Sequence, residues 1–131
     1  MSEWEHKDVW IQRRLTFAVE VSRHSVGEEN KWAVYVYIYP PHSLFATIDH
    51  KAGMFQSTCN ALPLHGGCSF FRRHLNPEKP AETTSYQIGA DYDHYWDEGR
   101  FRDVETKDEA REVFDDAEEL IRHMETYRPC V

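Results

Sequence analysis

Histidines, carboxylates and a pair of glycines are concentrated in one stretch of this chain, from position 65 to position 97. Imidazole and carboxylate groups that meet in a fold can hold a divalent metal ion, or they can transfer protons as general acid and base. Glycine pairs can turn backbone N–H groups toward an anion such as phosphate. The sequence therefore predicts a ligand site in this stretch. Its candidate residues are His65, Gly66, Gly67, Asp91, His94 and Asp97.

The first half of the stretch begins with His65-Gly66-Gly67. This backbone could form a concave turn that binds phosphate or carboxylate, with the neighbouring histidine as an additional donor or ligand. The alternative is an ordinary turn that leads the chain into a strand, which is the more common role of two adjacent glycines. Cys68 follows, and we expect it to be a small buried residue at the start of that strand rather than a nucleophile.

The second half of the stretch contains a histidine between carboxylates. In a strand, residues two apart share a face, so Asp91 and Asp93 would point the same way and His94 would follow on the turn. His65, Asp91 and His94 would then be the metal ligands. The same side chains could instead carry acid/base chemistry, or form an internal hydrogen-bond network that fixes the corners of the sheet. No cofactor is expected, although the cluster leaves room for a divalent metal, and whether the chain is an enzyme stays open.

The length and composition indicate a single domain over residues 1–131. The chain has 131 residues, of which 40% are hydrophobic and 14% aromatic, so it can bury a core without disulfide staples. Three cysteines without CxxC spacing predict neither a disulfide framework nor a zinc ribbon. No apolar run approaches the roughly 18 residues of a membrane helix, and the first residues lack the apolar core of a signal peptide. We therefore expect a cytoplasmic protein without a membrane partner.

Alternating apolar residues predict the strands of the fold. Residues 14–23 and 31–39 alternate in this way, and the polar, glycine-containing segment between them predicts an antiparallel hairpin. Residues 69–75 and 84–90 are expected to be two further strands, joined by an exposed, turn-rich loop. Residues 1–12 are expected to be a lead-in with one helical turn. The apolar face of the first strand is predicted to carry Leu15, Phe17, Val19 and Val21.

Residues 107–126 carry the clearest helical pattern, and a second, short helix is expected at residues 44–47. Thr106 and Glu109 fit a capping box at the start of the long helix, and apolar residues then recur at the spacing of one helix face. The expected fold is α+β, with an antiparallel sheet of about four to five strands and this amphipathic C-terminal helix packed on one face. The predicted buried stripe is Ala110, Val113, Phe114, Ala117, Leu120, Ile121 and Met124.

Negative charge is concentrated in the C-terminal part of the chain. The formal net charge is −8, yet residues 1–90 contain nine acidic and nine basic residues, whereas residues 91–125 contain 14 acidic and five basic ones. Such a block repels phosphates, so we expect no direct nucleic-acid partner and instead a basic protein surface or a cation. A solvated helix face that keeps the protein soluble would explain the charge equally well. The candidate partner-binding residues are Asp108, Glu112, Asp115 and Glu119.

Three short segments give the chain a resemblance to known proteins. They are YIYPPHSLF (residues 37–45), LHGGCSFF (residues 64–71) and YQIGADYDHYWD (residues 86–97). In this order, and followed by a C-terminal helix, they resemble a broad group of small, largely uncharacterised phage and prophage proteins. Those proteins carry a His-Gly-Gly-x-Thr-aromatic step and a Gly-x-Asp-x-x-His-x-x-Asp step, and this chain departs from them at Ser43 and Ser69, where proline and threonine are common.

The resemblance covers roughly residues 32–125 and implies a phage context, hence the cytoplasm of an infected host cell. The resemblance does not imply a particular enzymatic reaction. The resemblance also marks residues of the candidate site, and it does so independently of the chemistry of their side chains. The positions that it marks are His65, Gly66, Gly67, Gly89, Asp91, His94 and Asp97.

Two functions are expected from these observations. The first is a small acidic phage-type binding protein, an inhibitor of a host defence complex of the anti-CRISPR kind, whose acidic surface engages a basic host protein or nucleoprotein complex. The alternative is a small metal-dependent or acid/base enzyme, or a nucleotide-ligand binder. The tyrosine-rich face of residues 31–39 would suit a homodimer, or cover by another part of the chain. The alternative function would use His65, Asp91, His94 and Asp97.

Overall fold

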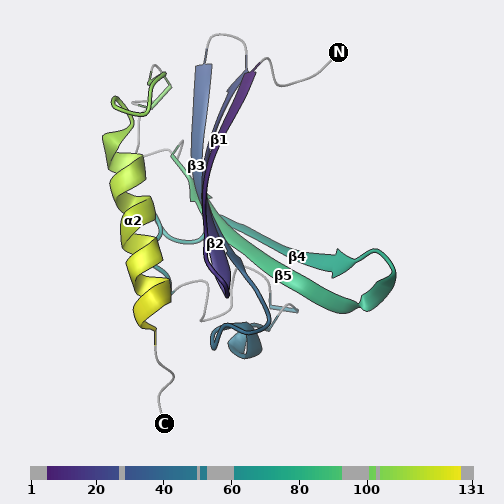
Figure 1. Ribbon diagram of the computed structural model, residues 1–131. Helices are drawn as coiled ribbons and strands as arrows, with labels where there is room; N and C mark the ends of the chain where they lie inside the picture. The colour runs from purple at the N-terminus through teal and green to yellow at the C-terminus, as the bar shows by residue number, and fades with distance from the viewer. Residues whose placement is uncertain are drawn as a thin grey trace.

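The computed structural model describes residues 6–26, 29–49, 51–52, 61–92, 101–102 and 104–127. These residues form one antiparallel sheet of five strands in the order β1-β2-β3-β5-β4, with a C-terminal helix packed against β2 and β3 (Figure 1). The predicted α+β class is confirmed. The elements are β1 (His6–Arg13), β2 (Phe17–Val26), β3 (Glu29–Ile38), the 3-10 turn η1 (Phe45–Thr47), β4 (Phe70–Asn76), β5 (Lys79–Asp91) and α2 (Arg111–Thr126).

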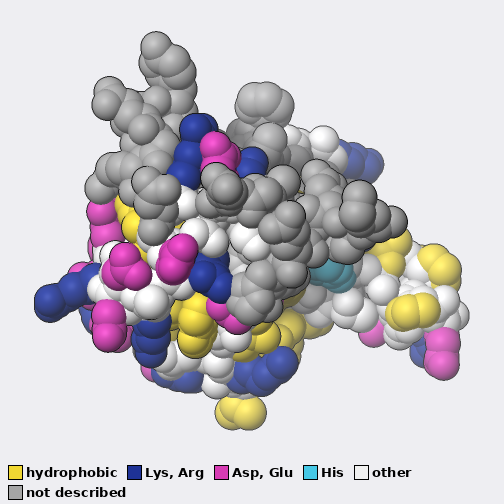
Figure 2. Space-filling view, turned by 90° about the horizontal axis from the view of Figure 1, so that it is seen from above, with side chains coloured by type: hydrophobic (Ala, Val, Ile, Leu, Met, Phe, Trp, Pro, Cys, Tyr) yellow, Lys and Arg dark blue, Asp and Glu magenta, His cyan; other side chains and the backbone are white. Residues whose placement is uncertain are grey.

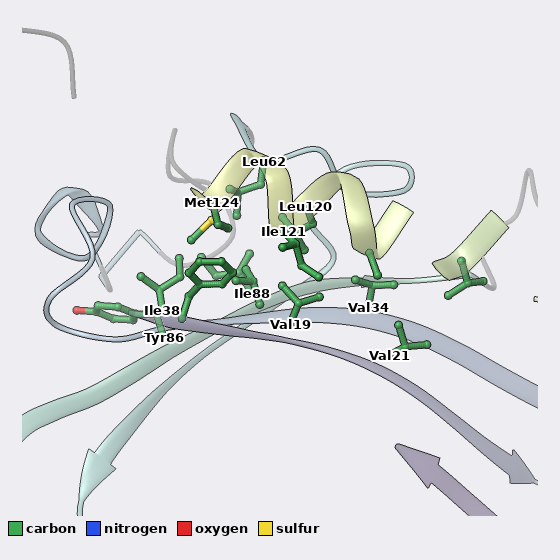
Figure 3. Close-up of a cluster of buried hydrophobic side chains, with 14 of the residues drawn as sticks. Val19, Val21, Val34, Ile38, Leu62, Tyr86, Ile88, Leu120, Ile121 and Met124 are labelled. Carbon is green, nitrogen blue, oxygen red and sulfur yellow. The ribbon is translucent and has the colours of Figure 1, made fainter. Parts of the chain in front are cut away.

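The central strands bury one face because their apolar residues alternate. Val19 of β2 lies opposite Val36 of β3, which lies opposite Ile88 of β5, and all three are buried. This row faces α2, whose Leu120 and other apolar side chains point onto the strands (Figure 3). Burial of such side chains is the main favourable term in folding, at about 1.5–3 kcal/mol for each large one.

The N-terminal strand was not anticipated, and the predicted helical turn is wrong for residues 6–12, the part of that segment that the structure describes. His6–Arg13 forms β1, which pairs with β2 along its whole length. Trp10 explains the difference, because its ring stacks on that of Trp32 at 5.6 Å between centroids and meets Phe114 of α2 edge-on. Leu15 lies outside the predicted face, in the turn between β1 and β2, where it is 97% exposed.

Helix α2 confirms the predicted stripe but begins later than expected, at Arg111 rather than residue 107. The Thr106 hydroxyl accepts a hydrogen bond from the Glu109 N–H at 3.2 Å, as in a capping box. That contact lies in the turn before the helix. Ala110, the N-cap residue of α2, makes no side-chain capping hydrogen bond. The predicted stripe is buried, apart from Phe114, which is half-buried.

The β4–β5 hairpin is longer than predicted and sweeps away from the other strands (Figure 1). Strand β5 begins at Lys79, so the exposed loop shrinks to a two-residue turn at residues 77–78. Near its other end, β5 passes under Tyr35 at Gly89, and a β-carbon there would overlap both the Tyr35 ring and the Val34 carbonyl oxygen. A glycine is therefore required by space at this position, while its φ is not in the left-handed region.

We expect Gly89→Ala to lower the free energy of unfolding by about 1–3 kcal/mol, because the added methyl group forces β3 and β5 apart. Gly67→Ala is the comparison, since a β-carbon at Gly67 meets nothing within 4 Å and only its φ of 90° opposes the change. Urea unfolding of both variants measures the difference. Wild-type stability in Gly89→Ala would contradict the close approach of the two strands.

Candidate functional site

His65 lies in a tight turn that leads into β4. The Gly67 N–H donates to the Leu64 carbonyl at 3.0 Å, and both glycines have positive φ, 69° at Gly66 and 90° at Gly67. Glycine tolerates this conformation because it lacks a β-carbon. The Ser69 N–H then donates to the Gly89 carbonyl at 2.9 Å, which anchors the chain to β5. The chain therefore turns at His65-Gly66-Gly67 and leads into β4, a geometry common to both alternatives for these residues.

The His65 ring packs on the side of the sheet that carries α2. It stacks on the Tyr92 ring at 4.3 Å between centroids, and Phe101 meets the pair edge-on. Tyr92 is 1% exposed, and its phenol O–H donates to the Asp116 carboxylate of α2 at 2.5 Å. Tyr92 thus contacts both His65 in the turn and Asp116 in the helix, and it links these two elements at the end of the sheet.

Asp91 lies on the opposite side of the sheet from His65. Adjacent residues of a strand point to opposite faces, and Asp91 is exposed whereas its neighbour Tyr92 is buried against α2. The charge of Asp91 also reaches Tyr35, on the face that α2 does not cover. The structure therefore does not bring His65 and Asp91 together. Asp93, His94 and Asp97 lie outside the described residues.

No group of three potential metal ligands occurs among the residues that the structure describes. Cys68 is half-buried, and its thiol donates to the Phe70 carbonyl at 3.4 Å. It lies just before β4, and it is half-buried where the sequence predicted a buried residue. Cys59 and Cys130 lie outside the described part of the chain.

His42 has a structural role that sequence reasoning missed. It is buried, and the Leu44 N–H donates to its Nδ1 at 3.0 Å. The other ring nitrogen, Nε2, must then carry the hydrogen, which it donates to the Met124 carbonyl in the last turn of α2 at 2.9 Å. His42 thereby binds a helix carbonyl that has no partner within the helix. The residues are 82 positions apart, so no local pattern could reveal the contact.

The acidic residues around α2 face solvent, apart from the half-buried Asp116. Residues 104–127 contain nine acidic and three basic residues, a net charge of −6 out of −8 for the chain. Acidic and interspersed basic side chains gather on the α2 side of the molecule (Figure 2). The Arg111–Asp115 pair at 3.9 Å is exposed and of the kind that contributes little to stability. The four predicted partner-binding residues, Asp108, Glu112, Asp115 and Glu119, are all exposed.

The other face of the sheet carries tyrosines around one carboxylate. Burial, and then the charge of Glu20, raises the pKa of Tyr37 to about 12, and the Tyr37 O–H donates to Glu20 Oε1 at 3.4 Å. Burial, followed by the charges of Glu20 and Asp91, also raises the pKa of Tyr35. Tyr35 meets Phe70 edge-on at 5.1 Å between ring centroids. Helix α2 packs on the reverse side, so this tyrosine face is not covered by it.

Comparison of the chain with known protein families, curated proteins and solved structures finds no match. Within the described residues, no helix has the length and apolar character needed to cross a membrane.

We expect Asp116→Asn to lower the free energy of unfolding by about 1.5–3 kcal/mol, because the buried Tyr92 phenol loses a charged hydrogen-bond acceptor. Asp115→Asn is the matched control on the next residue of α2. Asp115 is exposed, so its replacement should change stability by less than about 0.5 kcal/mol. Denaturant unfolding of the two variants tests this. Equal stabilities would show that the Tyr92–Asp116 bond does not join the sheet to the helix.

Tyr37 makes the stability depend on pH in the alkaline range. An unfolded tyrosine ionises near pH 10, whereas folded Tyr37 does so at about 12. Between these values the unfolded state releases a proton that the folded state retains, so stability falls as the pH rises. Tyr37→Phe should flatten this decline in a series of denaturant midpoints from about pH 8 to 12. Parallel curves for variant and wild type would contradict the prediction.

Proposed function

We propose that this chain is a binding protein that places the acidic face of α2 on a basic surface of a partner protein. The supporting observation is that Asp108, Glu112, Asp115 and Glu119 are exposed together around one helix whose reverse side is buried. In α2, Glu112, Asp115 and Glu119 follow one another at intervals of three and four residues, the spacing of a single helix face.

The helix is held rigidly enough to present these carboxylates in a fixed array. Val113, Ala117 and Leu120 anchor its reverse side in the core, and His42 binds its last turn through the Met124 carbonyl. A preorganised charged face loses little conformational entropy on binding, and its field accelerates encounter with an oppositely charged surface. A protein groove that normally binds nucleic acid carries such a positive charge.

The partner that we propose is a host defence complex, and the effect is inhibition of the anti-CRISPR kind. The resemblance to phage proteins supports a viral context, and the concentrated negative charge supports competition with nucleic acid for a basic groove. The alternative function, an enzyme or nucleotide binder built on His65, Asp91, His94 and Asp97, has less support because His65 and Asp91 lie on opposite sides of the sheet. His94 and Asp97 lie outside the described residues.

Charge reversal on α2 tests the proposal. We expect Asp115→Lys/Glu119→Lys to slow association with a purified RNA-guided effector complex at least tenfold at low salt, and to remove most of the salt dependence. Reversal of Asp108 and Glu112 as well should abolish binding. Surface-based binding measurements at two salt concentrations, with and without guide RNA on the complex, provide the readout.

The matched control is Glu78→Lys/Glu82→Lys, which alters the net charge by the same amount on the exposed end of the β4–β5 hairpin. This variant should associate within about twofold of wild type, because the end of the hairpin extends away from α2 (Figure 1) and exposed charges are screened by salt. Unchanged affinity and salt dependence in the α2 variants, or equal losses in both pairs, would overturn the proposal.

A further inference from the structure

A cleft of about 240 Å³ lies on the tyrosine face of the sheet, away from α2. The cleft exists because the small side chain of Ala18 in β2 lies between the larger side chains of Arg13 in β1 and Tyr37 in β3. Glu20 is the next residue of β2 on the same face, and it is flanked by Ile11. The residues that line the cleft are Ile11, Arg13, Ala18, Glu20, Tyr37 and Tyr39.

Glu20 is a half-buried carboxylate with little compensation for its charge. Its hydrogen bond from the Tyr37 O–H is long, at 3.4 Å. Among the described residues, no lysine, arginine or histidine forms an ion pair with it. A carboxylate removed from water costs free energy unless a cation or several donors neutralise it. Glu20 lies in the middle of the sheet with one such donor among the described residues, the Tyr37 O–H.

We propose that Glu20, Tyr37 and Tyr39 form a receptor site for one guanidinium group, the arginine side chain of a partner protein. A guanidinium can donate two hydrogen bonds to one carboxylate. Its flat, weakly hydrated face also packs favourably on aromatic rings, which suits it better than an ammonium to a cleft lined by tyrosines. The exposed apolar side chains of Val9 and Ile11, at 42% and 41%, border the site and offer contact area to the partner around it.

Arg13 at the rim is the internal competitor for this site. It lies opposite Ala18 and lines the cleft, yet its guanidinium is exposed and makes no ion pair with Glu20. An incoming arginine must displace or avoid this charge, because like charges repel at short range. Removal of Arg13 should therefore strengthen ligand binding. If the Arg13 charge instead only stabilises the folded protein beside Glu20, the same change would lower the stability of the protein and leave ligand binding unchanged.

The site is separate from the acidic face of α2, which packs on the opposite side of the sheet. The two proposals can therefore fail independently. The probe for this one is a single modified amino acid, Nα-acetyl-arginine amide, which is too small to require the helix. Its uncharged counterpart, Nα-acetyl-citrulline amide, has nearly the same shape.

The experiment is an NMR titration that follows the rings of Tyr37 and Tyr39. The arginine probe should shift these signals with a dissociation constant in the millimolar range, about 1–10 mM, as a single contact allows, and the citrulline probe should not. Glu20→Gln should weaken binding at least tenfold, and Arg13→Ala should tighten it. Glu78→Gln, which removes an exposed carboxylate at the end of the β4–β5 hairpin outside the cleft, is the control and should bind as wild type does.

A second measurement separates a receptor carboxylate from a structural one. If Glu20 is kept for a ligand, Glu20→Gln should raise the Tm of the free protein by about 3 °C, because it removes an uncompensated charge. If the Tyr37–Glu20 hydrogen bond instead stabilises the fold more than the carboxylate charge destabilises it, the Tm should fall. Equal responses to the arginine and citrulline probes, undiminished binding by Glu20→Gln, or a lowered Tm in that variant would each overturn the proposal.

Discussion

The burial of one helix stripe against one face of the sheet is the interaction on which the other features depend. Val113, Ala117, Leu120, Ile121 and Met124 of α2 lie on the apolar residues of β2 and β3. This contact removes from water most of the apolar surface that the sheet alternation creates. It also decides which face of the sheet is left to solvent, because the chain has one long helix among its described elements.

Two surfaces of opposite chemistry follow from that arrangement. The outer side of α2 collects most of the negative charge of the chain. The reverse side of the sheet presents tyrosines and aliphatic residues around Glu20 and Arg13. Aromatic residues are enriched at protein interfaces because they combine large area with few rotatable bonds. The protein therefore has two independent candidate contact surfaces, one electrostatic and one aromatic, joined by a common core.

Polar contacts then hold the helix in register on the sheet. The Tyr92–Asp116 bond fixes the end of β5 to the middle of α2, and the His42–Met124 bond fixes the loop after β3 to the last turn. Buried hydrogen bonds of this kind are directional, so they specify position where apolar packing alone would tolerate some sliding. Through one of them His42, which the sequence did not single out, becomes part of the packing of the fold.

The sequence by itself determined the class of fold, strands β2 to β5 and the buried stripe of α2, because alternation and helical periodicity are local patterns. It also located the acidic block. Only the tertiary structure decided that residues 6–13 form a strand, since the Trp10–Trp32 stack that favours it joins distant positions. The same holds for the separation of His65 from Asp91. Which side of a sheet a turn folds onto depends on contacts with Tyr92 and α2, and no spacing along the chain encodes that choice.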